Sequence, residues 1–106
     1  MPRNGAVADG ADKDARTKLE DVYKKAKADS EAAKGDKTRL DAYTKATMAL
    51  GDAYMYAKDL GPKDMYPNAL KLYREAYKAD PNTPDAKKNI ELIEDIYKSM
   101  GRKVPE

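Results

Sequence analysis

The sequence contains no Cys, His, Trp or Phe, and all eight of its aromatic residues are Tyr. Without Cys the chain cannot form a disulfide, and without Cys and His it lacks the usual ligands of structural zinc and haem. The same absences exclude every catalytic device that depends on a Cys or His side chain. We therefore expect a protein without metal or cofactor.

The net charge of the chain is small, and its apolar runs are short. The 21 Lys and Arg residues are balanced by 19 Asp and Glu residues, so the net charge is only +2. Because nucleic-acid binding draws on a concentrated positive charge, we expect no nucleic-acid partner. The apolar runs are too short for a membrane span, and residues 1–5 lack the apolar core of a secretory signal. These features favour a soluble, cytoplasmic protein, although the compartment itself stays open.

The residues that are abundant favour helices. The chain has 106 residues, enough for one small domain, and 17 of them are Ala, whereas Val and Ile occur three times each. Ala, Lys and Glu favour helices, and a shortage of β-branched residues disfavours a sheet. The composition therefore predicts an all-α fold with a core of Ala, Tyr and a few Leu, Ile and Met residues.

Apolar residues at three- and four-residue spacing predict four helices within residues 12–101. Their expected ranges are Asp12 to Gly35, Asp36 or Thr38 to Leu60, Asp64 to Asp80, and Thr83 to Gly101. The apolar stripe of the first helix comprises Ala15, Leu19, Val22, Tyr23, Ala26, Ser30 and Ala33. Short connections force neighbouring helices to run antiparallel, which predicts two stacked αα-hairpins. Residues 1–11 are expected to form a mobile tail, and residues 102–106 to fray.

The second and third predicted helices carry a known signature. Leu50-Gly51-Asp52-Ala53-Tyr54 is followed by Ala69, Tyr73, Ala76 and Pro81. In this pattern the chain resembles the tetratricopeptide repeat family over residues 44–97, with one and a half to two repeats. A six-residue insertion between Tyr54 and Ala69 is expected to lengthen the second helix by nearly one turn. Gly51 and Ala69 are interpreted as the small residues at which the two helices cross closely, with Tyr54 and Tyr73 filling the groove between them.

In the tetratricopeptide family the first helix of each repeat lines a concave face that receives a partner's peptide. The resemblance implies ten positions for this face: Lys45, Met48, Asp52, Met55 and Tyr56 on the second helix, and Asp85, Lys88, Asn89, Leu92 and Ile96 on the fourth. Met48, Met55 and Tyr56 lie off the stripe expected to pack the hairpin, which supports a contact role. Alternatively, the N-terminal helix covers this face and these residues belong to the core.

The fourth helix has a wider apolar arc than a surface helix needs, with Leu92 and Ile96 in excess. This excess suggests either a partner, including a second copy of the chain, or an N-terminal helix folded onto it. The resemblance implies a protein–protein interaction module that binds a peptide or helix, and the alternative is a structural subunit that self-associates. Carboxylate pairs such as Glu94-Asp95 are expected on solvated helix faces, so we expect no enzyme activity.

Overall fold

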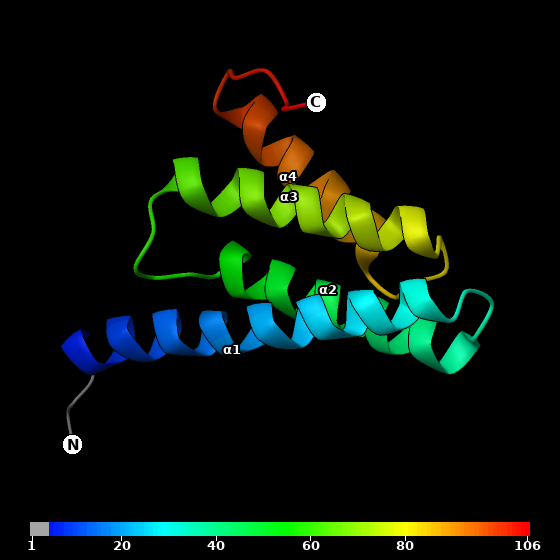
Figure 1. Cartoon of the computed structure of the whole chain (residues 1–106). Helices are drawn as coiled ribbons and strands as arrows, with labels where there is room; N and C mark the ends of the chain where they lie inside the picture. Colours follow the sequence, from blue (N-terminus) through cyan, green and yellow to red (C-terminus); the bar gives the residue numbers. More distant parts are fainter. Residues whose placement is uncertain (1–4) are drawn as a thin grey trace.

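A computed structural model of the chain describes the backbone of residues 5–106 and the side chains from residue 12 onwards. Over this range the fold is all-α, as predicted, and each helix runs back along its predecessor (Figure 1). The helices pack in chain order, α1 on α2, α2 on α3 and α3 on α4, in a flat stack of 44 × 37 × 18 Å. Their bounds are α1 Gly5–Ala32, α2 Lys37–Met55, α3 Pro62–Ala79 and α4 Ala86–Ser99.

The turn between α1 and α2 follows the sequence closely. Gly35 adopts a left-handed backbone with φ of +92°, a conformation that glycine tolerates at little cost. Asp36 then caps α2, accepting a hydrogen bond from the Arg39 amide at 3.1 Å. At its other end α1 begins at Gly5, before the predicted start at Asp12. Residues 1–4 of the predicted tail lie outside the described residues, and the mobility of the tail stays a prediction.

The predicted extension of the second helix to Leu60 is wrong, because α2 ends at Met55. The residues that follow form an irregular loop in which Ala57 is buried. Asp59 turns towards α1, where its carboxylate accepts two hydrogen bonds from Arg16 at 2.9 and 2.8 Å. The Arg16 hydrogen bond holds the pKa of Asp59 below its ordinary value. This contact therefore stabilises the fold at neutral pH and is lost as the pH falls through the lowered pKa.

Two other helix starts differ from the prediction. Helix α3 begins at Pro62 rather than Asp64, which places Pro67 inside the helix instead of in its first turn. Helix α4 begins at Ala86, and Thr83 does not cap it. The Thr83 hydroxyl instead donates to the Asp80 carbonyl at 2.6 Å, closing the α3–α4 turn. A threonine hydroxyl can satisfy either the preceding or the following backbone, and here the preceding turn holds it.

The C-terminal residues 102–106 contain no regular secondary structure but lie against α3. Val104 packs on the core, and the Arg74 guanidinium donates to the carbonyls of Pro105 and Glu106 at 2.8 and 3.0 Å. The fraying expected here concerns motion and stays a prediction. Within the described residues, no helix has both the length and the apolarity to cross a membrane.

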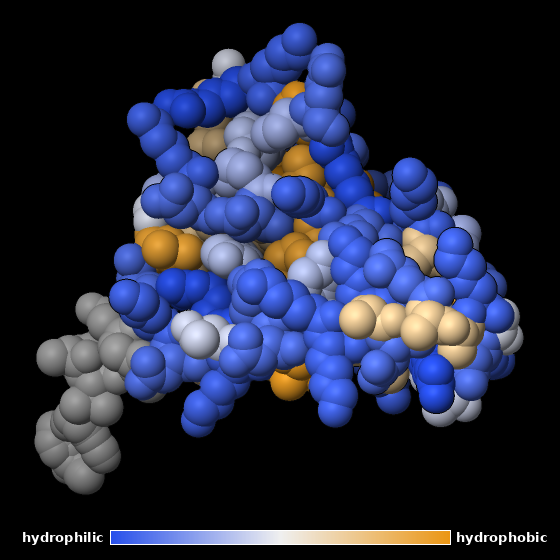
Figure 2. Space-filling model, in the orientation of Figure 1, coloured by the Kyte–Doolittle hydropathy of each residue, from blue (hydrophilic) through white to orange (hydrophobic). Residues whose placement is uncertain are grey.

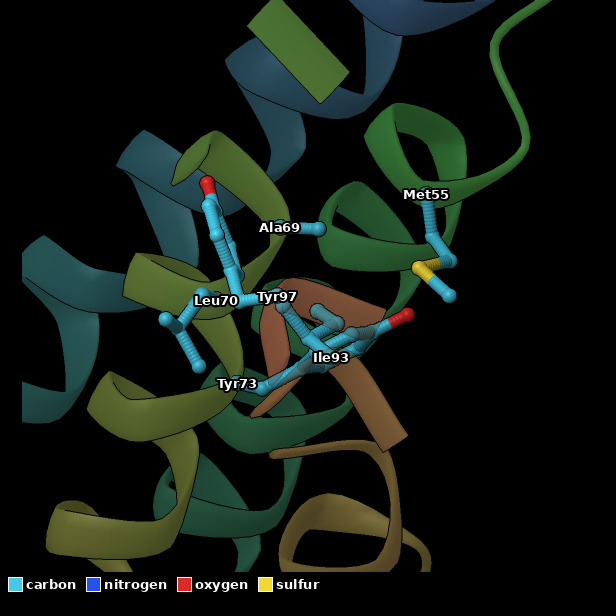
Figure 3. Packing of buried hydrophobic residues seen from close by; sticks show 6 residues of the cluster. All are labelled: Met55, Ala69, Leu70, Tyr73, Ile93 and Tyr97. Atoms are coloured by element: carbon cyan, nitrogen blue, oxygen red, sulfur yellow. The ribbon is translucent and has the colours of Figure 1, made fainter. Parts of the chain in front are cut away.

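The core lies between the last three helices. Six buried residues form its main cluster, and Figure 3 shows them gathered from these helices: Met55 from α2, Ala69, Leu70 and Tyr73 from α3, and Ile93 and Tyr97 from α4. Charged and polar side chains cover most of the face seen in Figure 2, with strongly apolar atoms visible only in small areas. A small core of this kind matches a composition with few large aliphatic residues.

The close crossing predicted at Gly51 is confirmed. A Cβ atom at Gly51 would lie 2.8 Å from the Tyr73 ring, which is fully buried on the facing helix. Ala69 is also fully buried. The Tyr73 hydroxyl reaches past this contact and donates to Asp52 at 2.6 Å. The glycine thus lets the aromatic ring lie directly against the α2 backbone.

Gly51→Ala is expected to lower the free energy of unfolding by about 1–3 kcal/mol, because overpacking displaces a buried ring. Alanine gains about 1 kcal/mol of helix propensity over glycine, so an open site would show stabilisation instead. Chemical denaturation followed by circular dichroism measures the sign. A more stable Gly51→Ala variant would contradict the close crossing.

Candidate functional site

The five predicted positions on α2 do not share one environment. Lys45, Asp52 and Tyr56 are exposed, and Tyr56 retains 66% of its accessible surface. Met48 is partly buried against the core, and Met55 belongs to the core itself, with only 7% exposed. The interpretation of Met55 as a surface residue is therefore wrong. The core cluster that contains Met55 also includes residues of α3 and α4, so this side chain belongs to the interior.

On α4 the predicted positions are more accessible. Lys88 and Leu92 are exposed, with 42% of Leu92 accessible, and Asp85 is exposed just before the helix. Asn89 and Ile96 are half-buried, and Ile96 packs against the core. Helices α1 and α4 lie at opposite ends of the stack (Figure 1), so α1 does not fold over Leu92. Part of the apolar excess predicted for α4 thus remains open.

A groove of about 570 Å³ runs along the exposed side of α2 to the α3–α4 turn. It brings together three of the predicted residues, Lys45, Met48 and Asp52, whereas the predicted α4 residues lie outside its lining. The remaining lining residues are Lys37, Asp41, Thr44 and Ala49 from α2, and Asp80, Asn82, Thr83 and Pro84 from the turn. The contribution of the turn was not predicted from the sequence.

The groove combines both signs of charge with a methionine floor. Lys37 and Asp41 form an exposed ion pair at 3.8 Å near one end. At the other end, the Tyr73 hydroxyl fixes Asp52 through its 2.6 Å hydrogen bond. Burial, and then the bond to Asp52, raise the pKa of Tyr73, so its hydroxyl stays protonated and donates at neutral pH. Such a surface offers carboxylate acceptors, an ammonium donor and an adaptable apolar contact to a peptide.

A second polar cluster joins three helices on another side of the stack. Glu75 of α3 accepts hydrogen bonds from the hydroxyls of Tyr23 on α1 and Tyr43 on α2. The Lys27 ammonium lies 3.6 Å from the same carboxylate, and the centroids of the two tyrosine rings are 6.3 Å apart. Burial, and then the bond to Glu75, raise the pKa of both phenols. The periodicity placed Tyr23 on an apolar stripe, but no local signal indicated that Glu75 would meet both tyrosines.

Glu75→Gln is expected to cost about 1.5–3 kcal/mol, the range for hydrogen bonds to charged groups. Glu91→Gln provides the control, because Glu91 is exposed on α4 and a surface charge contributes about 1 kcal/mol or less. Urea denaturation of both variants measures the difference. Equal midpoints would show that the Glu75 cluster adds nothing to stability.

A larger cavity, of about 770 Å³, lies elsewhere, between the start of α3 and the end of α4. Its lining includes Pro62, Pro67, Tyr97, Met100 and Arg102, none of which the resemblance had indicated. Within the described residues there is no group of three or more acidic side chains placed to hold a metal ion. The groove along α2 is therefore the candidate site that gathers predicted residues.

Comparisons with protein-family models, with curated proteins and with solved structures give no match for this chain. The tetratricopeptide resemblance thus depends on the motif residues alone and stays a prediction. The close packing of Tyr73 against Gly51, which the motif implied, is present in the structure and does not depend on the family to which the chain belongs.

Proposed function

We propose that the chain is a protein–protein interaction module, an adaptor or scaffold of tetratricopeptide type, that binds a peptide or helix of a partner. The observation that carries the proposal is the groove along α2, where Lys45, Met48 and Asp52 lie together beside the α3–α4 turn. Leu92 on α4 lies outside this groove but is 42% exposed, so it offers a second apolar contact to a partner. The proposal assigns no catalytic step, metal or cofactor to these residues.

The mixed lining of the groove indicates the chemistry of the peptide. Asp41, Asp52 and Asp80 share this lining with Lys37 and Lys45, so a peptide with both signs of charge and an apolar side chain fits better than a uniformly charged one. Met48, already half-buried by the core, supplies the apolar contact. Polar groups then set orientation and register, while the apolar contact contributes most of the affinity.

Selection from a random peptide library displayed on phage tests this function. Peptides that bind the chain should lose at least about tenfold in affinity with Lys45→Glu, because a reversed charge at a close contact costs more than 1.4 kcal/mol. Lys24→Glu is the control, since Lys24 is exposed on α1 away from the groove lining. Selected peptides that bind Lys45→Glu and the unaltered chain equally would contradict the proposal.

Self-association through α4 is the second proposed function, favoured by the exposure of Leu92 and Met100 at 42% and 43%. A structural subunit of this kind would need no free peptide ligand. Light scattering distinguishes the two functions. A dimer that Leu92→Lys converts to a monomer would favour the structural subunit, whereas a chain that is monomeric at micromolar concentration favours the interaction module.

A further inference from the structure

Helix α1 is attached to the rest of the fold differently from the other helices. None of its described side chains, from Asp12 to Ala32, is buried, whereas α2, α3 and α4 each supply buried residues. Leu19, Tyr23 and Ala26 are only half-buried, and Val22 is 55% exposed although its periodicity placed it on the packed stripe. Helix α1 therefore covers part of the apolar surface of its neighbours without fully burying a described side chain of its own.

Polar contacts at two points add to this attachment. At the first, Arg16 donates twice to Asp59 and lies 5.4 Å above the Tyr54 ring, and the Lys58 amide donates to Asp12 at 3.3 Å. At the second, Tyr23 and Lys27 meet Glu75. Arg16 and Tyr23 are seven positions apart, which is about 10 Å along a helix. The spacing of Arg16 and Tyr23 on α1 thus places one donor beside each of the two carboxylates, those of Asp59 and Glu75.

The surface beneath α1 combines these carboxylates with an apolar floor from α2 and α3. We call it the α1-docking surface; it comprises Leu50, Tyr54, Asp59, Leu72 and Glu75. A cavity of about 130 Å³ remains at this junction, lined among others by Tyr23 and Leu50. Helix α1 occupies this surface in the structure, and its side chains bond to the two carboxylates of the surface, Asp59 and Glu75.

The connection between α1 and α2 can open without breaking either helix. Only residues 33–36 separate them, and Gly35 can change its backbone angles at little cost. The Asp36 cap belongs to α2 and stays intact when α1 swings away. Every contact that α1 makes on its own chain is then available on an identical chain, so exchange between two copies sacrifices none of them.

We propose that the α1-docking surface receives α1 from a second copy of the chain, which gives a reciprocal dimer with exchanged N-terminal helices. The second copy is the occupant because its α1 carries the required Arg16, Tyr23 and Lys27 at the required spacing. On its own chain α1 has an effective concentration of about a millimolar, as for other short linkers. Exchange therefore becomes appreciable as the chain concentration approaches that value.

The absence of Cys allows a direct test with two singly substituted chains. One carries Asp12→Cys and a tag, and the other carries Lys58→Cys, because these two positions adjoin in the docked arrangement. The chains are mixed in equal amounts at about 1 mM and oxidised. Exchange predicts a mixed disulfide well above about half of all disulfides, the share that random pairing gives. A mixed share at the random value would overturn the proposal.

Two further measurements keep the test decisive. Adding Arg16→Gln and Tyr23→Phe to the tagged chain should return the mixed share to the random value, while circular dichroism reports that the helices remain. In the chain without cysteine, light scattering at the same concentration should show a dimer that Leu92→Lys leaves intact, because Leu92 lies on α4. A dimer that Leu92→Lys disperses would overturn exchange of α1 and would favour contact through α4.

Discussion

Tyr73→Ala is expected to lower the free energy of unfolding by about 3–5 kcal/mol, the range for removing a large buried aromatic side chain. Tyr73 is fully buried, touches the α2 backbone at Gly51 and holds Asp52 through its hydroxyl. Its loss leaves a cavity where the two helices are closest, and it also leaves the end of the groove without its anchor. Urea denaturation followed by circular dichroism provides the measurement.

Tyr77→Ala is the matched control on the same helix, four residues further on. Tyr77 is 37% exposed and belongs to no part of the core cluster. Its replacement is expected to cost less than about 1 kcal/mol, as for most surface substitutions. Comparable losses for the two tyrosines would show that the core does not centre on the contact between α2 and α3.

Met55→Lys is expected to destabilise the chain by at least about 2 kcal/mol, because it removes a buried methionine and places an ammonium group in the core. Met55 is 7% exposed among Ile93 and Tyr97 of α4. The variant is therefore expected to melt at a lower temperature and with less cooperativity. Thermal unfolding by circular dichroism measures both properties.

Leu92→Lys separates this core effect from an effect on the surface. Leu92 is 42% exposed on α4, so the new ammonium group stays in water and stability should change by less than about 0.5 kcal/mol. The two substitutions introduce the same charge at positions that the sequence had assigned to one face. Equal melting temperatures would contradict the different environments that the structure gives them.

Local signals in the sequence predicted much of the fold. Gly35 and Asp36 mark the first turn because one needs a left-handed backbone and the other caps a helix, and both effects act within a few residues. The close crossing at Gly51 was predicted for a related reason, since only a small residue allows two helices to approach. The all-α class followed from composition and periodicity.

Two of the errors involve contacts between distant residues. The sequence predicted helix up to Leu60, but α2 ends at Met55, and Asp59 in the loop that follows bonds to Arg16, which lies 43 residues earlier. Met55 lies off the packing stripe of its own hairpin and is buried in a cluster that residues of both α3 and α4 complete. Neither the end of α2 nor the burial of Met55 can be predicted from the spacing of nearby residues.

Only part of the candidate site could be predicted, because the rest of it depends on the tertiary arrangement. Lys45, Met48 and Asp52 follow helical spacing along one helix, so their common side could be deduced. The α3–α4 turn completes the groove through Asp80 and Thr83, whose positions depend on where α3 ends and how the turn closes. The Glu75 cluster needs three helices at once, which only the tertiary arrangement reveals.

Amide chemical shifts test the central proposal, binding on the α2 groove, most directly. The ¹⁵N-labelled chain is titrated with a peptide selected from the phage library. Binding in the groove predicts the largest shifts at Lys45, Met48 and Asp52 and in the α3–α4 turn, with small shifts over residues 62–72. Largest shifts on α1, or around Pro62 and Met100 at the other cavity, would contradict the proposed interaction face.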